Sequence, residues 1–177
     1  MLAAALWSCG KNDWSNLQLN NLEDQRVELS EYAQQQTVFI FLSPECPLCQ
    51  NYSVKINELA EELASDSLKF IGVVSGTFYP KDQIQRYLVK YEMHLPVILD
   101  PEFRLAQALN AEITPEVFYT APGGEVLYCG AIDDWAISLG QKRINVQNDY
   151  LRNAIVAHQQ RKEINPTRTK AVGCFIE

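Results

Sequence analysis

The sequence has no long hydrophobic run, no basic excess and no dense set of cysteines, and each absence excludes a class of protein. No stretch reaches the roughly 18 consecutive apolar residues that a membrane-spanning helix needs. The net charge of −7 argues against a nucleic-acid partner, because phosphate groups are bound by basic surfaces. Five cysteines scattered over 177 residues are too few for a disulfide-stapled scaffold.

The composition is that of a folded domain with a full core. Of the residues, 47% are hydrophobic and 21% are charged, and neither a repeat nor a low-complexity linker divides the chain. We therefore predict one domain over 14–163. An N-terminal segment, 1–13, precedes it, and an extended C-terminal tail without periodicity, 164–177, follows it.

The N-terminal segment carries a candidate targeting signal. Leu6-Trp7-Ser8-Cys9 resembles a bacterial lipobox, in which the cysteine is lipidated and becomes the mature N-terminus. The alternative is a frayed terminus with a chance cysteine. The lipobox interpretation predicts membrane attachment through a lipid on Cys9 and a location in the bacterial periplasm or envelope, whereas the alternative leaves a cytoplasmic location.

Residues 37–42 form a continuous apolar run rich in β-formers, which is typical of a central strand buried on both faces. A short loop follows, and apolar residues then recur at helical spacing from Leu48 to Leu63. Cys46 and Cys49 therefore lie where a buried strand ends and an amphipathic helix begins.

The rest of the chain alternates strands with helices and ends in a hairpin. This order favours the α/β class, with a central mixed β-sheet flanked by helices and an N-terminal β-hairpin extension. The predicted strands are 17–19, 26–29, 68–74, 95–99, 116–120 and 125–129, and the further predicted helices are 82–91, 103–109 and 148–160.

The Cys46-Pro47-Leu48-Cys49 motif predicts thiol–disulfide chemistry. Unpaired N–H groups and the helix dipole at a helix N-terminus favour a thiolate, so Cys46 is predicted to have a lowered pKa and to attack disulfides. Cys49, one turn later and on the apolar side, is predicted to be more buried and to resolve the mixed disulfide. A structural or metal-binding dithiol is the alternative, but zinc would need further ligands at suitable spacing, and we predict no metal.

The segment from Phe41 to Cys49 resembles the active-site segment of the thioredoxin-like superfamily, especially its redoxin and peroxiredoxin-like (AhpC/TSA-related) branch. Ile113-Thr114-Pro115-Glu116 matches the position of that family's cis-proline. The resemblance implies that Pro115 lies against the cysteine pair and that the backbone of Thr114 binds an extended substrate chain. Pro47 and Glu45 flank the nucleophile as further substrate-binding candidates.

Two departures from the relatives narrow the function. Peroxiredoxins carry a proline seven residues before the reactive cysteine, where this chain has Phe39, although Ser43 fills their Thr or Ser position. Thioredoxin has a tryptophan and a buried aspartate where this chain has Glu45 and Ile40. The partner that removes the proton of Cys49 is therefore unassigned, and Glu116 is a weak candidate.

These residues predict a thiol–disulfide oxidoreductase that acts on protein disulfides. It would need no cofactor beyond the Cys46–Cys49 disulfide, and its partners would be protein substrates and an upstream electron donor. Two alternatives stay open, a copper-delivery protein of the same fold and an atypical thiol peroxidase with antioxidant activity. Cys174, in a C-terminal Gly-Cys segment, is a candidate accessory thiol that would pair with Cys46 or with Cys129, or stay free.

Overall fold

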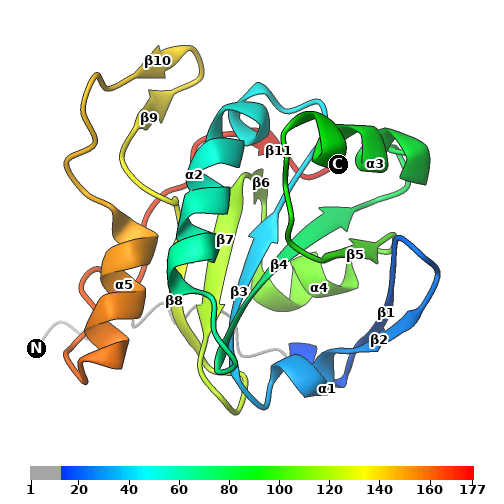
Figure 1. Cartoon of the computed structure of the whole chain (residues 1–177), viewed down its shortest axis with the longest axis horizontal. Coiled ribbons are helices and arrows are strands. Elements are labelled where there is room, and N and C mark those ends of the chain that lie inside the picture. The colour runs from blue at the N-terminus through cyan, green and yellow to red at the C-terminus, as the bar shows by residue number, and fades with distance from the viewer. Residues whose placement is uncertain (1–12) are drawn as a thin grey trace, which may run out of the picture.

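A seven-stranded mixed sheet with helices on both faces forms the centre of the molecule in the computed structural model, which describes residues 13–177 (Figure 1). The strand order is β2-β1-β5-β4-β3-β7-β8. Its strands are β1 (Gln18–Asn21), β2 (Arg26–Glu28), β3 (Gln36–Phe41), β4 (Leu68–Ser75), β5 (Val97–Asp100), β7 (Glu116–Thr120) and β8 (Val126–Gly130). The helices are the 3-10 turn η1 (Trp14–Asn16), α1 (Leu29–Tyr32), α2 (Pro47–Leu63), α3 (Lys81–Lys90), α4 (Arg104–Leu109) and α5 (Tyr150–Gln159).

The pairing confirms the predicted mixture of parallel and antiparallel strands. β3, β4 and β5 pair in parallel, whereas β7 and β8 close one side as an antiparallel hairpin. The N-terminal hairpin β1–β2 extends the other side, where β1 pairs antiparallel with β5. The predicted α/β class with an N-terminal hairpin is therefore confirmed.

Strand β3 is buried on both faces, as its apolar run predicts. Val38 and Ile40 join one core cluster, and Phe39 and Phe41 join the other, because successive side chains of a strand point to opposite faces. α2, α3 and α5 pack on the first face, and η1, α1 and α4 pack on the second. The sheet is thus covered on both sides.

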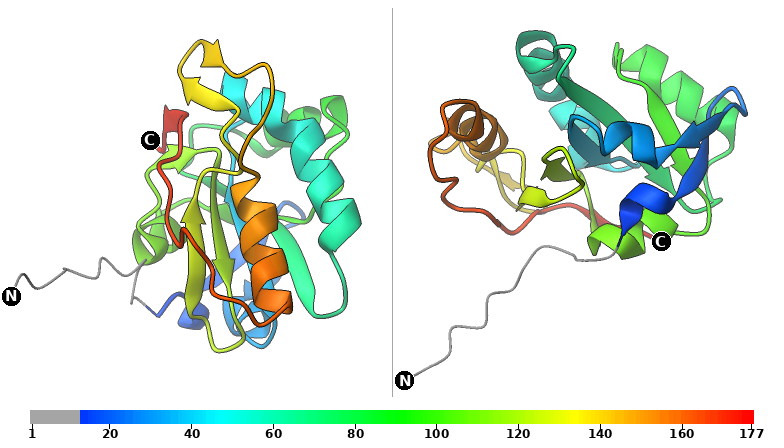
Figure 2. Two further views of the ribbon diagram at one scale, coloured as in Figure 1. Left: turned by 90° about the vertical axis from the view of Figure 1, so that its left-hand side faces the viewer. Right: turned by 90° about the horizontal axis from the view of Figure 1, so that it is seen from below.

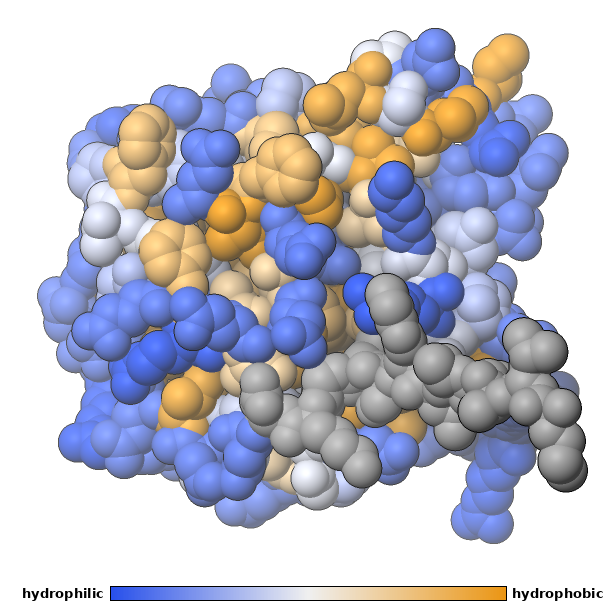
Figure 3. Space-filling model, turned by 180° about the vertical axis from the view of Figure 1, so that it is seen from behind, coloured by the Kyte–Doolittle hydropathy of each residue, from blue (hydrophilic) through white to orange (hydrophobic). Residues whose placement is uncertain are grey.

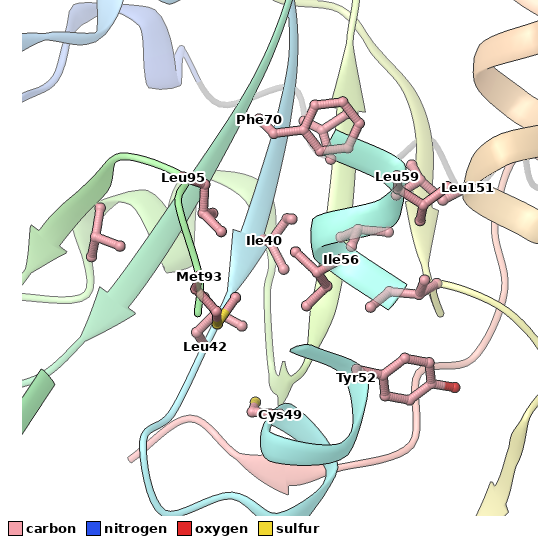
Figure 4. Close-up of a cluster of buried hydrophobic side chains, with 14 of the residues drawn as sticks. Ile40, Leu42, Cys49, Tyr52, Ile56, Leu59, Phe70, Met93, Leu95 and Leu151 are labelled. Carbon is pink, nitrogen blue, oxygen red and sulfur yellow. The ribbon is translucent and has the colours of Figure 1, made fainter. Parts of the chain in front are cut away.

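Helix α2 buries one stripe against the first face of the sheet. Cys49, Tyr52, Ile56 and Leu59 are buried, and in Figure 4 Cys49 and Ile56 point toward β3, whereas Tyr52 points away from it and Leu59 lies beside Leu151 of α5. Their spacing of three or four residues places them on one side of an α-helix. This packing fixes the N-terminal turn of α2, and with it the cysteine motif, against the end of β3.

Six elements of the described residues are absent from the prediction. They are η1, α1, the small hairpin of β9 (Ala136–Ser138) and β10 (Gln141–Lys142), and the two-stranded sheet of β6 (Ile113–Thr114) and β11 (Cys174–Phe175). The β9–β10 hairpin projects at the top left of Figure 1. In the view from behind, hydrophobic side chains gather across the upper part of the molecule (Figure 3).

The C-terminal tail is extended, but it also docks along the domain. The backbone N–H of Cys129 donates to the carbonyl of Thr167, and the N–H of Thr169 donates to the carbonyl of Cys129. The tail then runs past β8 to β6, where it forms β11 (Figure 2).

Within residues 13–177, no helix combines the length and apolar character needed to cross a membrane. The predicted lipid site, Cys9, and nearly all of the predicted segment 1–13 lie outside the described residues.

Replacing Phe39 by alanine tests the two-sided burial of β3. Phe39 is fully buried and makes an edge-to-face contact with Trp14, with ring centroids 4.9 Å apart. We expect Phe39→Ala to lower the free energy of unfolding by about 3–5 kcal/mol in urea titration, because it leaves a cavity between sheet and helix layer. Val89→Ala, at an exposed position of α3, is the control and should change it by less than about 0.5 kcal/mol. Equal effects of the two variants would contradict this packing.

Candidate active site

The cysteine motif begins helix α2 directly after a tight turn. Cys46 is the N-cap residue of α2, and Pro47 occupies the first helical turn, where its missing N–H has no cost. The N–H of Cys46 donates to the carbonyl of Ser43 over 3.1 Å, which closes the turn between β3 and α2. The motif therefore lies at the predicted strand-to-helix junction, and Cys46, Cys49 and Cys174 are the free thiols among the described residues.

Cys46 and Cys49 lie one helical turn apart at the start of α2. The backbone N–H of Ser43 donates to the Cys49 sulfur over 3.4 Å, and the hydroxyl of Tyr87 donates to the Cys49 carbonyl over 3.2 Å. When protonated, Cys46 itself donates to the carbonyl of Thr114 over 3.1 Å.

The pKa values of the two thiols are driven in opposite directions. The hydrogen bond from Cys49, with a second one from Cys174, lowers the pKa of Cys46 to about 4, although burial opposes the change. Burial, followed by the negative charge of Cys46, raises the pKa of Cys49 well above its ordinary value. At neutral pH, Cys46 is thus the thiolate and Cys49 the proton donor that stabilises it.

Thr114 and Pro115 lie at the same end of the sheet as the cysteine motif, because Glu116 of β7 pairs with Phe41 of β3, and the carbonyl of Thr114 reaches the sulfur of Cys46. The Thr114–Pro115 peptide bond is cis, and both residues are buried. Glu116 follows them, and its carboxylate accepts the backbone N–H groups of Glu112 and Ile113 over 3.0 and 3.3 Å. Glu116 therefore holds the backbone that leads into β6.

The C-terminal tail lies beside the sulfur of Cys46. β11 pairs antiparallel with β6, so that Cys174 lies opposite Thr114, whose carbonyl is 3.1 Å from the sulfur of Cys46. Cys46 is only 1% exposed, nearly as little as Cys49 at 0%. Cys49 is thus the more buried of the two thiols, as predicted, but Cys46 is almost as fully covered, by residues distant in sequence.

A cavity of about 520 Å³ opens beside the covered thiols. Its lining includes Cys46 and Cys174, together with the aromatic side chains of Phe78, Phe103 and Phe175. Phe78 and Phe175 are both largely exposed. The sulfur of Cys46 thus faces a hollow that is lined by both aromatic and polar side chains and whose wall is partly made by the tail.

The remaining predicted site residues lie around this hollow. Glu45 is exposed, lines the cavity, and accepts a hydrogen bond from the side-chain amide of Gln83 over 2.8 Å. Ser43, at the peroxiredoxin hydroxyl position, donates to the hydroxyl of Tyr79 over 2.9 Å. Glu116 bonds to backbone groups, and none of its hydrogen bonds reaches Cys49.

The sequence does not predict that two tyrosines lie near the motif. Tyr79 and Tyr87 reach it only because α3 packs beside α2. Cys129 is buried in the second core cluster. Within residues 13–177, no group of three or more His, Cys, Asp or Glu side chains is arranged to hold a metal ion.

Comparison with known proteins places this geometry in a family. Residues 11–129 match the AhpC/TSA family, whereas no curated protein sequence matches the chain. The fold is similar to that of a hypothetical protein from Sinorhizobium meliloti, with a TM-score of 0.81, 21% identity, and coverage of 96% of this chain and 93% of that one.

Two characterised proteins share the fold at lower similarity. Peroxiredoxin Q from Xanthomonas campestris has a TM-score of 0.63 and 17% identity, with 85% of this chain and 98% of that one covered. A secreted disulfide oxidoreductase of Mycobacterium tuberculosis has a TM-score of 0.57 and 15% identity, with 64% of this chain and 82% of that one covered. The fold is therefore thioredoxin-like, as predicted.

The asymmetry of the two thiols has a measurable pH signature. In the reduced protein, we expect the ultraviolet absorbance of the Cys46 thiolate to persist as the pH falls from neutral and to disappear around pH 4, since the thiolate exists above its lowered pKa. The difference between wild type and Cys46→Ser isolates this signal.

A second variant tests the cause. Cys49→Ala removes the largest stabilising hydrogen bond, so the midpoint should move upward toward the ordinary value. A thiolate signal at Cys46 that appears only in alkaline solution in the wild type would contradict the assignment.

Proposed function

The chain belongs to the AhpC/TSA family, and from that membership and the geometry of its thiols we propose that it is a thiol–disulfide oxidoreductase acting on protein disulfides. One observation carries the proposal: two free thiols lie one helical turn apart, with Cys46 at the N-cap of α2 and Cys49 buried in its first turn. In this proposal Cys46 is the nucleophile and Cys49 the resolving thiol. No cofactor is needed beyond the disulfide that the two cysteines form.

The first step is attack by the Cys46 thiolate on one sulfur of a substrate disulfide. A Cys46–substrate disulfide forms, the substrate S–S bond breaks, and the other substrate sulfur leaves as a thiolate that takes up a proton. The N–H groups of the first turn of α2 stabilise the attacking anion.

The second step is attack by Cys49 on Cys46, which releases the reduced substrate. In the resting state the charge of Cys46 raises the pKa of Cys49. That charge is lost once Cys46 is in a mixed disulfide, so the proton of Cys49 becomes easier to remove just when its thiolate is required. The departing substrate thiolate is a suitable acceptor for that proton, and Glu116 is not needed for it.

The direction of net electron flow is set by an upstream partner. To work as a reductase, the enzyme needs an electron donor that reduces the Cys46–Cys49 disulfide after each turnover. The proposed contacts of the substrate chain are Thr114 and Glu45, which line the cavity beside the sulfur, and Pro115 and Pro47, which follow Thr114 and Cys46 in the sequence.

A location in the bacterial periplasm or envelope fits this activity, and a protein of the same fold is described as secreted. The lipid on Cys9 stays a prediction. Incorporation of labelled palmitate into the wild type and its loss in Cys9→Ser would support it.

A peroxidase activity is the second candidate, because family membership favours it. Against it, the hydroxyl of Ser43 bonds to Tyr79 rather than to the sulfur of Cys46. Peroxide consumption that depends on Cys46 and exceeds the rate of disulfide reduction would select the peroxidase.

Reduction of insulin disulfides tests the proposed function. With dithiothreitol as electron donor, we expect Cys46→Ser to lower the rate to the uncatalysed level, because no other thiol takes its place at the helix N-terminus. Cys49→Ser should instead accumulate a mixed disulfide between Cys46 and insulin, visible by mass spectrometry, because the resolving thiol is absent. Glu58→Gln, at an exposed position of α2, is the control and should reduce insulin at the wild-type rate. Full activity of Cys46→Ser would contradict the proposal.

A further inference from the structure

The end of the tail occupies the place where the family resemblance puts an extended substrate chain. Cys174 lies opposite Thr114 and Phe175 opposite Ile113 in an antiparallel pair, and the N–H of Ile176 donates to the carbonyl of Glu112 over 2.9 Å. Figure 1 shows β11 beside β6 near the first turn of α2, and Figure 2 shows the tail approaching along β8. The edge of β6 is therefore filled by the chain itself.

Gly173 makes this close approach sterically feasible. A Cβ atom at this position would lie 2.0 Å from the carbonyl oxygen of Thr114 and 2.8 Å from a methyl group of Ile113. No side chain fits there without moving the backbone of β6 or of the tail. The glycine before Cys174 thus brings the next residue against the strand that faces Cys46.

Cys174 is placed as a reacting group. Cys174 is partly exposed, lines the same cavity as Cys46, and lies opposite Thr114, whose carbonyl oxygen is 3.1 Å from the Cys46 sulfur. Burial and the charge of Cys46 raise the pKa of Cys174 to about 12 in the reduced protein. The charge on Cys46 disappears when this sulfur enters a disulfide, which makes the proton of Cys174 easier to remove.

We propose that the C-terminal strand is a built-in substrate. Cys46 forms a disulfide bond with Cys49 in one state and with Cys174 in the other, and the two states interconvert by thiol–disulfide exchange. This inference rests on the proposed function and adds a third thiol to it. A substrate protein must displace the strand to reach Cys46. The segment that replaces it fits best when a glycine precedes its cysteine, as Gly173 does here.

The exchange is balanced within the chain. Starting from the Cys46–Cys49 disulfide, the thiolate of Cys174 attacks the sulfur of Cys46. A Cys46–Cys174 bond forms, the Cys46–Cys49 bond breaks, and Cys49 leaves as a thiolate that takes up the proton lost by Cys174. No electrons are gained or lost, and the reverse attack by Cys49 restores the first disulfide.

The Cys46–Cys174 bond can be detected by itself in the Cys49→Ala variant treated with oxidised glutathione. In Cys49→Ala, Cys46 attacks glutathione disulfide, and Cys174 should then displace glutathione to give Cys46–Cys174. After acid quench and proteolysis, mass spectrometry should find this bond in most molecules and the Cys46–glutathione adduct in few. An accumulated adduct with a Cys174 that is still open to alkylation would overturn the proposal. Because position 49 is buried, Cys49→Ser is run in parallel.

Gly173→Val in the same background tests the docking. The added side chain clashes with Thr114, so the glutathione adduct should replace the Cys46–Cys174 bond, whereas the control Lys170→Ala, at an exposed tail position, should leave the bond intact. With Cys49 present, Gly173→Val should reduce insulin at least about threefold faster than wild type, because the nucleophile is uncovered. Unchanged adduct levels and an unchanged insulin rate in Gly173→Val would contradict the built-in substrate.

The outcomes separate this inference from the proposed function. If the chain reduces insulin through Cys46 but no Cys46–Cys174 bond forms, the inference is wrong and the function stands. If the bond forms but wild type and Gly173→Val both leave insulin intact, the third thiol stands and the activity on protein disulfides is wrong.

Discussion

The spacing of Cys46 and Cys49, one helical turn apart at the start of α2, is the constraint on which the site depends. It allows a hydrogen bond from Cys49 to lower the pKa of Cys46, which is the largest cause of that change. That turn is held by the packing of α2 on the sheet and by the end of β3. The buried core thereby fixes the charge of a single sulfur atom.

In the proposed function, the burial of Cys46 controls which substrates reach it. A sulfur that is 1% exposed cannot meet a large protein directly, however low its pKa. Access requires movement of the β11 strand, which is held on β6 by a short two-residue pair. Reactivity is set locally by the helix terminus, and access is set by a tail 128 residues further along the chain than Cys46.

Much of this arrangement could be predicted from the sequence, because it depends on the hydrophobic pattern and turn residues of short segments. The apolar run before the motif, the helical spacing after it and the Pro-Gly-Gly hairpin identify β3, α2 and the β7–β8 pair. The tail could not be placed in this way, since residues 164–177 have no periodicity and their position depends on contacts with β8 and β6. The same holds for Tyr79 and Tyr87, which reach the motif through the packing of α3, and for the β9–β10 hairpin, whose strands are too short to produce a pattern. Gly173 before Cys174 was the one local sign of a close approach.

The most direct test of the central claim is the redox equilibrium of the Cys174→Ser protein in glutathione buffers, analysed by acid quench and peptide mapping. Without the third thiol, the account predicts a single two-electron transition in which Cys46 and Cys49 pass together from two thiols to one disulfide. If Cys46 instead carried only glutathione, or stayed a thiol under oxidising conditions while Cys49 was free, Cys46 and Cys49 would not form the redox pair on which the proposed function rests.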